Sequence, residues 1–419
     1  MISKYRLALP LLLSCVAWYA QAATVTAASC SSSAVQAAVN SANSGDTVLV
    51  PGGSCTYTTA VTVTAAITIN GQGTTTITTA AQNAFSITPT ASAATRFTGF
   101  TLVTSGVVND SQSPIKTHGS TSTFPFRIDH NTFSCADSST FISTDGNAPG
   151  LIDHNTFTAG ASAEMIHNLG VGAGNNAGWQ DSVTPGSFNM LYLEGNTFTF
   201  AATGNPAYFW GTAAIQSYYG ARTVVRYNTM NMVHVDQHGT AGAVGARWWE
   251  IYDNTFNTNV ADASQGDYLH LRGGSGIVYN NHHVGTNLVT GGINLEEEDT
   301  GTWPLAYQVG SGINGNTNGH STCAGPVNSN PAYFWGNDAD MPVGVDEGGI
   351  QLNRDYFVSP SQPGSLLRQE VSGDTCSTTY AYTAFTYPYP LDANGLPSPN
   401  GSGSSSAPSP PTNLAATVQ

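Results

Sequence analysis

A short motif recurs along the middle of the chain, in which apolar and polar residues alternate and the run ends at an asparagine. Its six copies are Ile128-Asp-His-Asn131-Thr-Phe133, Ile152-Asp-His-Asn155-Thr-Phe157, Leu193-Glu-Gly-Asn196-Thr-Phe198, Val225-Arg-Tyr-Asn228-Thr-Met230, Ile251-Tyr-Asp-Asn254-Thr-Phe256 and Ile277-Val-Tyr-Asn280-Asn-His282. The asparagines step by 24, 41, 32, 26 and 26 residues, a base period near 24 with insertions. A unit this short cannot form its own core, so the period predicts a solenoid of stacked coils.

The asparagines that end the motifs are predicted to be structural. Asparagine tolerates the left-handed backbone of a sharp turn, and its amide can hydrogen-bond to the equivalent amide one coil away. We therefore predict a ladder of stacked side chains formed by Asn131, Asn155, Asn196, Asn228, Asn254 and Asn280. His130 and His154 occupy equivalent positions in two motifs, which predicts that their rings also stack.

A second series of alternating segments follows the asparagines. Five of the six run into glycine, and the series comprises Phe141–Gly146, Met165–Gly170, Ala214–Gly220, Val233–Gly239, Tyr268–Gly273 and Gly292–Asp299. An alternation with period two predicts strands that place one face in a core and the other in solvent. Stacked at the coil period, these strands predict a parallel sheet.

The beginning of the chain is predicted to close the solenoid. Between Ser31 and Ala42, the apolar residues Val35, Ala38 and Val39 fall on one helical face. A helix there would cover the open end of the first coil, which begins near Asp46, and would block edge-to-edge pairing. Strands around Val61–Val63, Ile67–Ile69 and Phe97–Leu102 are predicted to form the early coils.

Residues 1–22 are predicted to be a signal peptide of a secreted chain. A basic start precedes the apolar run Leu7–Ala17, which is too short to span a bilayer, and Ala20-Gln21-Ala22 forms a small-x-small cleavage site. A lipoprotein anchored at Cys15 is the alternative, because Leu12-Leu13-Ser14-Cys15 loosely resembles a lipobox.

The composition predicts three further segments. Residues 23–392 form the repeat domain, and residues 393–411 are a Ser/Gly/Pro-rich linker. Residues 412–419 resemble the first strand of a fibronectin type III module, too short to fold alone, which predicts an additional C-terminal module in a longer parent chain.

The charge and cysteine content limit the partners. The chain has a formal net charge of −15, which repels nucleic acid and anionic membranes, so we expect neither nucleic-acid binding nor membrane insertion. We also expect a monomer.

In an exported protein, Cys30–Cys55 and Cys323–Cys376 are candidate disulfides, which leaves Cys135 over. The chain has no CxxC pair, so a cysteine zinc site is not expected.

Several motifs resemble those of a known superfamily. Cys30, the short helix, Gly45-Asp46-Thr47-Val48 and Pro51-Gly52-Gly53 look like the opening of bacterial pectate-lyase-like β-helix proteins. The Asn-Thr-Phe coils, Arg354-Asp355-Tyr356-Phe357 and Tyr387-Pro388-Tyr389-Pro390 resemble the same superfamily, over roughly residues 28–392. The resemblance implies an all-β, right-handed parallel β-helix with an N-terminal capping helix. Its members include lyases, glycosidases and adhesins, so the fold does not decide the function.

The second strand series predicts where polar side chains gather. Stacked in register, its first outward row reads Ser143, His167, Gln216, His234, His270 and Asn294. Its second outward row reads Asp145, Leu169, Tyr218, Asp236, Arg272 and Glu296. Neighbouring coils lie about 4.8 Å apart, so the last three coils predict one patch. The patch comprises His234, Asp236, His270, Arg272, Asn294 and Glu296.

A rigid patch of acid, base and imidazole groups, bordered by insertions rich in aromatic residues, suits a carbohydrate-active enzyme. The resemblance favours a polysaccharide lyase that cleaves a uronate-containing glycan by β-elimination, with Arg272 or a flanking histidine as the base. The predicted catalytic residues are Arg272, His234, His270 and Asp236. The predicted substrate-binding residues are His167, Gln216, Tyr218, His238, Asn294 and Trp210. The predicted ligands of a Ca²⁺ ion are Asp236, Glu296, Glu298 and Asp299.

Three alternatives remain open from the residues alone. A glycoside hydrolase would use Asp236 and Glu296, two coils and about 10 Å apart, which suits an inverting pair. A transition-metal site would use His234-x-Asp236-x-His238, whose alternate residues share a face, together with His270. A noncatalytic glycan-binding or adhesin solenoid would need aromatic side chains but no such convergent set of charged groups.

Overall fold

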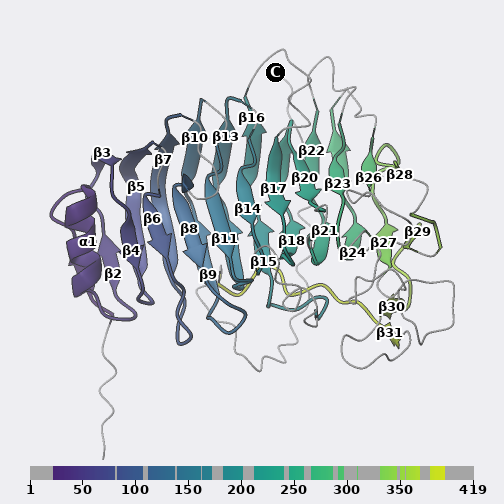
Figure 1. Cartoon of the computed structure of the whole chain (residues 1–419), viewed down its shortest axis with the longest axis horizontal. Helices are drawn as coiled ribbons and strands as arrows, with labels where there is room; N and C mark the ends of the chain where they lie inside the picture. Colours follow the sequence, from purple (N-terminus) through teal and green to yellow (C-terminus); the bar gives the residue numbers. More distant parts are fainter. Residues whose placement is uncertain are drawn as a thin grey trace, which may run out of the picture.

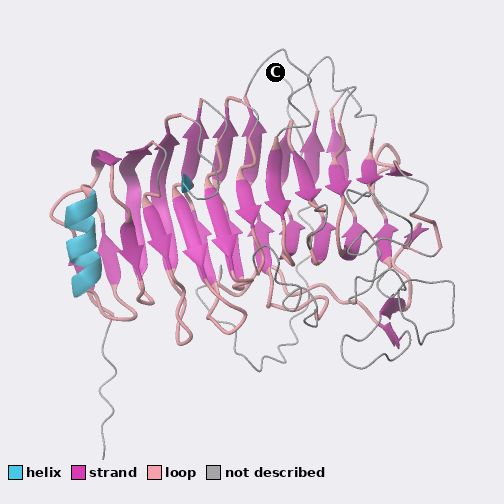
Figure 2. Cartoon of the chain, viewed as in Figure 1, coloured by secondary structure: helices cyan, strands magenta, loops and turns pink. Residues whose placement is uncertain are grey.

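The described part of the chain is a solenoid of parallel strands (Figure 1). The structure is a computed structural model, and it describes residues 22–80, 83–106, 112–136, 139–161, 163–171, 183–201, 212–239, 245–258, 266–285, 291–296, 309, 331–346, 350–353, 355–368 and 378–391. The strands stack side by side along the long axis, and the single described helix lies at the end that carries the first strands (Figure 2). The prediction of an all-β parallel solenoid is confirmed.

Three ladders of strands make up the walls. The first ladder comprises β1 (Thr24–Thr26), β2 (Thr47–Leu49), β5 (Thr68–Thr79), β7 (Arg96–Thr104), β9 (Phe126–Asp129), β12 (Gly150–Asp153), β15 (Leu191–Glu194), β18 (Arg222–Arg226), β21 (Trp248–Tyr252), β24 (Ser275–Tyr279), β27 (Ala332–Trp335) and β29 (Tyr356–Ser359). The second ladder shares β5 and β7 and adds β3 (Gly53–Tyr57), β10 (Thr132–Cys135), β13 (Thr156–Ala159), β16 (Thr197–Phe200), β19 (Thr229–Asn231), β22 (Thr255–Asn257) and β25 (His282–Val284).

The third ladder carries the second strand series of the sequence. It comprises β4 (Val61–Val63), β6 (Phe85–Ile87), β8 (Ile115–His118), β11 (Ile142–Asp145), β14 (Ile166–Asn168), β17 (Ala213–Ser217), β20 (His234–Gln237), β23 (Leu269–Leu271), β26 (Ile293–Leu295) and β28 (Val343–Val345). A separate antiparallel pair joins β30 (Leu366–Arg368) to β31 (Thr378–Tyr380).

Apolar side chains fill the interior of the solenoid, and along each strand they alternate with outward polar side chains. Phe133, Phe157 and Phe198 come from the Asn-Thr-Phe motifs and stack through the core, with ring centroids 4.7 Å apart at each step. The threonine before each phenylalanine points outward, because successive strand residues face opposite sides. Trp249 and Cys135 also lie buried in this core. The repeat therefore builds one continuous core from units that could not bury their own.

The predicted asparagine ladder is present, but it is displaced by one residue at its last copy. Each ladder asparagine after Asn131 accepts, through Oδ1, a hydrogen bond from the backbone N–H of the preceding asparagine at 2.9–3.2 Å. The ladder runs through Asn131, Asn155, Asn196, Asn228, Asn254, Asn281 and Asn337. The predicted Asn280 was wrong, because Glu250 pairs with Ile277 and so places Asn281 opposite Asn254.

The sharp turn is made by the residue before each ladder asparagine, not by the asparagine itself. His130, His154, Tyr227, Asp253 and Asn280 hold φ between 51° and 56°. Asn280 therefore takes the left-handed turn that the sequence had predicted for the ladder asparagine itself. The rings of His130 and His154 stack at 5.2 Å, as their equivalent positions predicted.

The helix α1 (Ser32–Ser41) begins at the predicted place. Ser31 is its N-cap and accepts a hydrogen bond from the Ala34 backbone N–H at 3.4 Å, which satisfies one of the open donors of the first turn. Val35, Ala38 and Val39 are buried in the core at the end of the stack. The Cys30–Cys55 disulfide confirms one predicted pairing. Cys323 and Cys376 lie outside the described residues.

The outer face of the first ladder is covered by the C-terminal segment, residues 378–391. Tyr382, Tyr389 and Leu391 form a second apolar cluster with outward residues of the ladder strands, among them Tyr192 and Trp248. The same face holds the buried carboxylate of Glu250, which accepts hydrogen bonds from Trp248 Nε1 and from the Tyr382 hydroxyl.

Within the described residues, no helix is long and apolar enough to cross a membrane. The predicted signal peptide up to residue 21, the Cys15 anchor, the linker and the predicted module start all lie outside the described residues.

Candidate functional site

The register of the third ladder places the outward side chains. Its pairings align Ser143, His167, Gln216, Asp236, His270 and Asn294 in one row. The sequence had placed His234 in that row and Asp236 in the next, and this was wrong. The register shifts between Ala213 and Ile215 of β17, so that His234 pairs with Ala213 while Asp236 pairs with Gln216.

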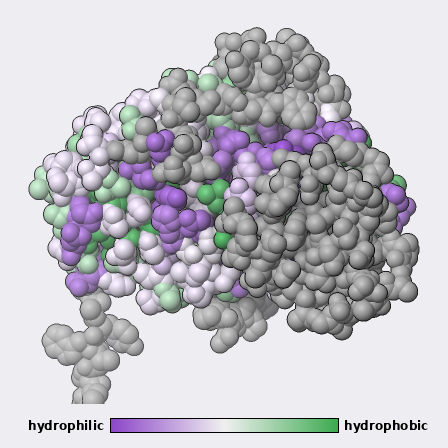
Figure 3. All heavy atoms as spheres, in the orientation of Figure 1, coloured by the Kyte–Doolittle hydropathy of each residue, from purple (hydrophilic) through white to green (hydrophobic). Residues whose placement is uncertain are grey.

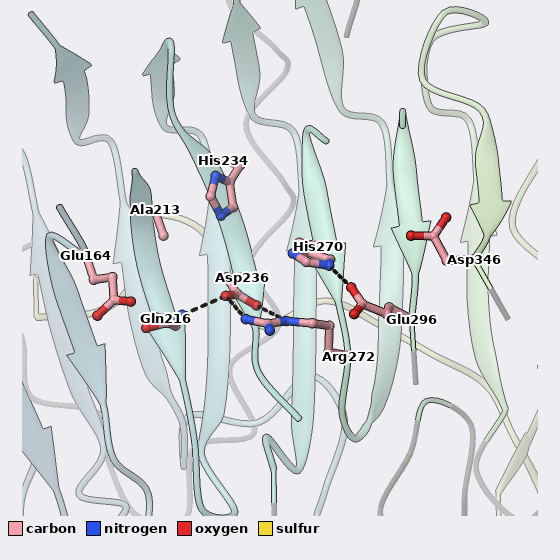
Figure 4. A pocket seen from close by; sticks show the side chains of 9 residues that line it. All are labelled: Glu164, Ala213, Gln216, His234, Asp236, His270, Arg272, Glu296 and Asp346. Atoms are coloured by element: carbon pink, nitrogen blue, oxygen red, sulfur yellow. Dashed lines mark hydrogen bonds and ion pairs between the residues drawn. The ribbon is translucent and has the colours of Figure 1, made fainter. Parts of the chain in front are cut away.

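A pocket of about 380 Å³ opens over these strands (Figure 4). Its lining residues are Glu164, Ala213, Gln216, His234, Asp236, His270, Arg272, Glu296 and Asp346. Five of the six residues in the predicted patch line it. The sixth, Asn294, lies in the same row and donates a hydrogen bond from Nδ2 to Asp346 Oδ2 at 2.7 Å.

Asp236 is the most enclosed acid of the pocket. Its side chain is 3% exposed and accepts hydrogen bonds from Arg272 Nη2 at 2.5 Å and Gln216 Nε2 at 2.8 Å. Burial opposes its ionisation, but the Arg272 guanidinium outweighs that effect and holds the pKa of Asp236 below its usual range. Asp236 is therefore charged at neutral pH and fixes the position of the guanidinium.

His270 and Glu296 form a second pair beside the first. Nε2 of His270 contacts Glu296 Oε2, and Figure 4 shows both side chains turned toward each other next to Arg272. This hydrogen bond lowers the pKa of Glu296, so its carboxylate is charged. Because a carboxylate can only accept, the contact places a ring proton on Nε2, and in the neutral imidazole the lone pair is then on Nδ1. The ring of His234 lies 6.5 Å from that of His270, measured between centroids.

A third pair, again an imidazole with a carboxylate, lies at one end of the pocket. Nε2 of His167 contacts Oε2 of Glu164, whose side chain is 41% exposed. The Tyr218 ring meets the His167 ring edge-on at 5.6 Å and stacks on the His238 ring at 4.4 Å. Neither Tyr218 nor His238 lines the pocket. His238 contacts the Gly239 carbonyl through Nδ1, so the predicted metal set of His234, Asp236 and His238 does not converge.

Asp267 lies near the opposite end, within interaction distance of Asn294 and Asp346. It is 3% exposed, its Oδ1 faces Gly291, and its Oδ2 has no hydrogen-bond partner among the described atoms. Burial raises its pKa to about 6, although a protonated His270 and a hydrogen bond from Asn294 act in the other direction. The sequence did not single out this residue.

Two of the four predicted calcium ligands, Asp236 and Glu296, lie within the described residues, and both already have partners. Asp236 and Glu296 direct their carboxylates at Arg272 and His270, and a second positive charge there would compete with the guanidinium. Glu298, Asp299 and Trp210 lie outside the described residues. Among the described residues, no group of three or more His, Cys, Asp or Glu side chains is arranged to hold a metal ion.

Sequence reasoning missed Glu164, Ala213 and Asp346 in the lining. Asp346 follows β28, whose Gly344 pairs with Asn294, so it is the next member of the outward row that contains Glu296. The alternation Val343-Gly344-Val345-Asp346 carried the signal, but it follows a long insertion that interrupts the period. Glu164 precedes β14, and its backbone pairs with that of Ala213 in an isolated parallel β-bridge.

The surface around the pocket is polar. In Figure 3, hydrophilic residues gather in a band over the third ladder, on the half of the molecule that carries β17 to β28. A scan against protein-family models finds none that matches the chain. A search of curated proteins likewise returns no match.

Proposed function

We propose that the pocket is the active site of a secreted polysaccharide lyase that cleaves a uronate-containing glycan by β-elimination. The observation that carries the proposal is the adjacency of two pairs, Arg272 with Asp236 and His270 with Glu296, in one polar pocket. A β-elimination next to a carboxylate needs a fixed cation for that carboxylate and a base for the neighbouring proton.

Arg272 is suited to bind the uronate carboxylate. A guanidinium stays charged at all relevant pH values, and Asp236 holds this one in place. The sequence allowed Arg272 as the base. Its ion pair with Asp236 instead favours an electrostatic role, because the carboxylate stabilises the protonated guanidinium.

His270 is suited to be the base. Glu296 orients its ring and stabilises the imidazolium that forms, as a carboxylate does for a histidine in other acid–base dyads. In the proposed step, His270 removes the proton beside the uronate carboxylate. The electron pair forms a carbon–carbon double bond, and the glycosidic oxygen leaves. His234, which also lines the pocket, is placed to protonate that oxygen.

The hydrolase alternative is less well supported by the same groups. An inverting or retaining glycosidase needs one carboxylic acid that stays protonated, and therefore a raised pKa. Asp236 and Glu296, the two predicted carboxyls, both have lowered pKa values. A noncatalytic binding solenoid does not require the buried Arg272–Asp236 pair. It remains an outcome of the experiment below.

Several features of the pectate-lyase-like superfamily belong to the same proposal. We propose that the coils wind in the right-handed sense, which parallel strand crossovers prefer. We also propose that α1 caps the first coil, supported by its buried Val35, Ala38 and Val39. A monomer exported through its signal peptide would meet its polysaccharide outside the cell.

The test is a panel of pectin, alginate, glycosaminoglycans and neutral glycans. A lyase yields an unsaturated product with new ultraviolet absorbance, whereas a hydrolase yields reducing ends without it. We expect His270→Ala to lower the rate by roughly 10²–10⁴-fold, the usual contribution of a general base. His118→Ala is the matched control, because His118 lies in an earlier coil of the same ladder and pairs with Asp145.

A chelator tests the calcium prediction in the same assay. Since Asp236 and Glu296 are already paired, we expect the activity to persist. The lyase proposal fails if no uronate glycan gives the unsaturated product, or if His270→Ala and His118→Ala behave alike. Binding without turnover, unaffected by Arg272→Ala, would instead indicate a glycan-binding solenoid.

A further inference from the structure

The pocket is acidic although its proposed substrate is an acid. Its lining has four carboxylates, those of Glu164, Asp236, Glu296 and Asp346, against the single guanidinium of Arg272. Asp236 and Arg272 balance each other, and Glu296 is paired with His270. The two remaining carboxylates, Glu164 and Asp346, are held by His167 and by the neutral amide of Asn294.

These two carboxylates lie at opposite ends of the pocket along the solenoid axis. Glu164 precedes β14, and Asp346 follows β28. In Figure 4 they stand on either side of the central group that contains Arg272 and His270. The strands between them are about 4.8 Å apart, so each end lies several coils from the other. A glycan that runs along the axis would meet a carboxylate at each end and, between them, the Arg272 guanidinium that is ion-paired with Asp236.

A polymer of uronates does not match this pattern. A carboxylate on every sugar would place negative charges beside Glu164 and Asp346 whenever one carboxylate occupied Arg272. Like charges brought together in a partly enclosed site oppose binding, and opposite charges favour it. Ammonium groups, or sugars without charge, would be accepted at both ends.

We infer that the pocket takes a glycan in which a uronate is flanked by amino sugars with unblocked ammonium groups. The uronate carboxylate would bind Arg272, and the flanking ammonium groups would face Glu164 and Asp346. The inference rests on the proposed function for its central uronate. The preference for ammonium groups at Glu164 and Asp346 is the new part of the inference, and it can be tested by binding alone.

The experiment measures binding to the His270→Ala variant, so that no probe is cleaved. The probes are polygalacturonate oligosaccharides and alternating uronate–glucosamine oligosaccharides of equal length, the latter with and without N-acetyl groups, in calcium-free buffer. We expect the de-N-acetylated alternating probe to bind about 100-fold more tightly than polygalacturonate, or about tenfold for each end. This corresponds to roughly 1.4 kcal/mol for each end. The N-acetylated probe should fall between them.

Neutralising the ends should remove the preference. In the Glu164→Gln/Asp346→Asn double variant, also carrying His270→Ala, we expect the ratio to fall to within about threefold of unity. Asp145→Asn is the control, because Asp145 lies outside the pocket and pairs with His118. It should leave the ratio unchanged. Thermal unfolding of each variant checks that the fold is kept.

The outcomes separate this inference from the lyase proposal. Tighter binding of polygalacturonate, or a ratio that the double variant does not change, overturns the inference. An alternating probe that binds with the expected ratio but is never cleaved by the wild-type protein upholds the inference and overturns the lyase proposal. Failure of every probe to bind overturns both.

Discussion

Asp267 shows how a single buried carboxyl can make the stability of this protein depend on pH. Its side chain lies near one end of the pocket, 3% exposed, with one oxygen against Gly291. An unfolded aspartate has a pKa near 3.9, and burial raises that of Asp267 to about 6. The folded state therefore binds this proton more tightly than the unfolded state. Its contribution to stability is complete below about pH 4 and is lost as the pH rises through about 6.

We expect Asp267→Asn to stabilise the protein at neutral pH. Asparagine has the shape of the protonated acid but cannot acquire the charge that burial disfavours. A pKa difference of about two units corresponds to roughly 2–3 kcal/mol. Urea unfolding should show a gain of that order at pH 7.5 and little change at pH 4. If wild type and variant keep the same difference in unfolding free energy at both pH values, Asp267 does not have the raised pKa.

At the pocket centre, stability depends on pH in the opposite direction from that at Asp267. The pKa of Asp236 is lowered, because Arg272 outweighs its burial. Its stabilising effect is present above the unfolded pKa and is lost as the pH falls through the folded one. The sequence indicated that Asp236 and Arg272 would be neighbours. It could not show that they pair, because that depends on the register shift in β17, which moves Asp236 into the row of Gln216.

At the scale of elements, the coil is defined by two adjacent residues with different roles. The first takes the left-handed turn, and the second forms the amide ladder. In the last predicted motif both residues are asparagine, Asn280 and Asn281, so composition alone could not distinguish the roles. The pairing of Glu250 with Ile277 decides the matter, because it turns Val278 into the core and sets the register of every residue that follows.

The two asparagines should respond differently to mutation. Asn281→Ala removes the Oδ1 that accepts from the backbone N–H and Nδ2 of Asn254. It leaves buried donors without an acceptor, and we expect the unfolding free energy to fall by roughly 2–4 kcal/mol. Asn280 is exposed with φ 52°, so Asn280→Gly keeps the turn and should change stability by about 0.5 kcal/mol or less. Chemical denaturation of both variants measures the contrast, and a larger loss for Asn280→Gly would contradict the assigned register.

The C-terminal segment was expected from a resemblance, but its position could not be read from periodicity. Residues 378–391 have no repeat pattern, and they cover polar groups that lie far away in the sequence. Arg226 donates to the Phe385 carbonyl at 2.6 Å and to the Thr386 carbonyl at 2.8 Å. The Tyr382 hydroxyl donates to Glu250 at 2.7 Å. Backbone carbonyls thus satisfy a buried guanidinium, which no sequence pattern encodes.

Tyr382→Phe tests whether this segment stabilises the coils beneath it. The variant keeps the ring in its apolar cluster but removes the hydrogen bond to the buried Glu250. Since leaving one partner of a buried hydrogen bond unsatisfied costs about 1–3 kcal/mol, we expect a loss of that order in unfolding free energy. Tyr387→Phe is the control, because Tyr387 is 37% exposed, and its effect should be smaller. Equal effects of the two substitutions would show that the Glu250 bond adds nothing.

At the scale of the whole molecule, the period predicted the architecture and the aligned strands predicted most of the pocket. Six lining residues were foreseen because a solenoid brings equivalent positions together at a fixed spacing. Glu164 and Asp346 were not foreseen, because both lie beside insertions that interrupt the period. They also raise the excess of lining carboxylates over guanidinium groups from one to three, so the charge of the pocket could only be judged in three dimensions.

That acidity predicts an unusual response to salt. In the His270→Ala background, polygalacturonate should bind more tightly as NaCl rises from about 10 mM to about 150 mM, because the Debye length falls from about 30 Å to about 8 Å and screens the repulsion from Glu164 and Asp346. A glycan with ammonium groups should bind less tightly over the same range, and a neutral glycan should not respond. Isothermal titration at both salt concentrations measures these slopes. A pocket dominated by Arg272 would give the reverse signs, because a basic site loses affinity for polyanions as salt is added.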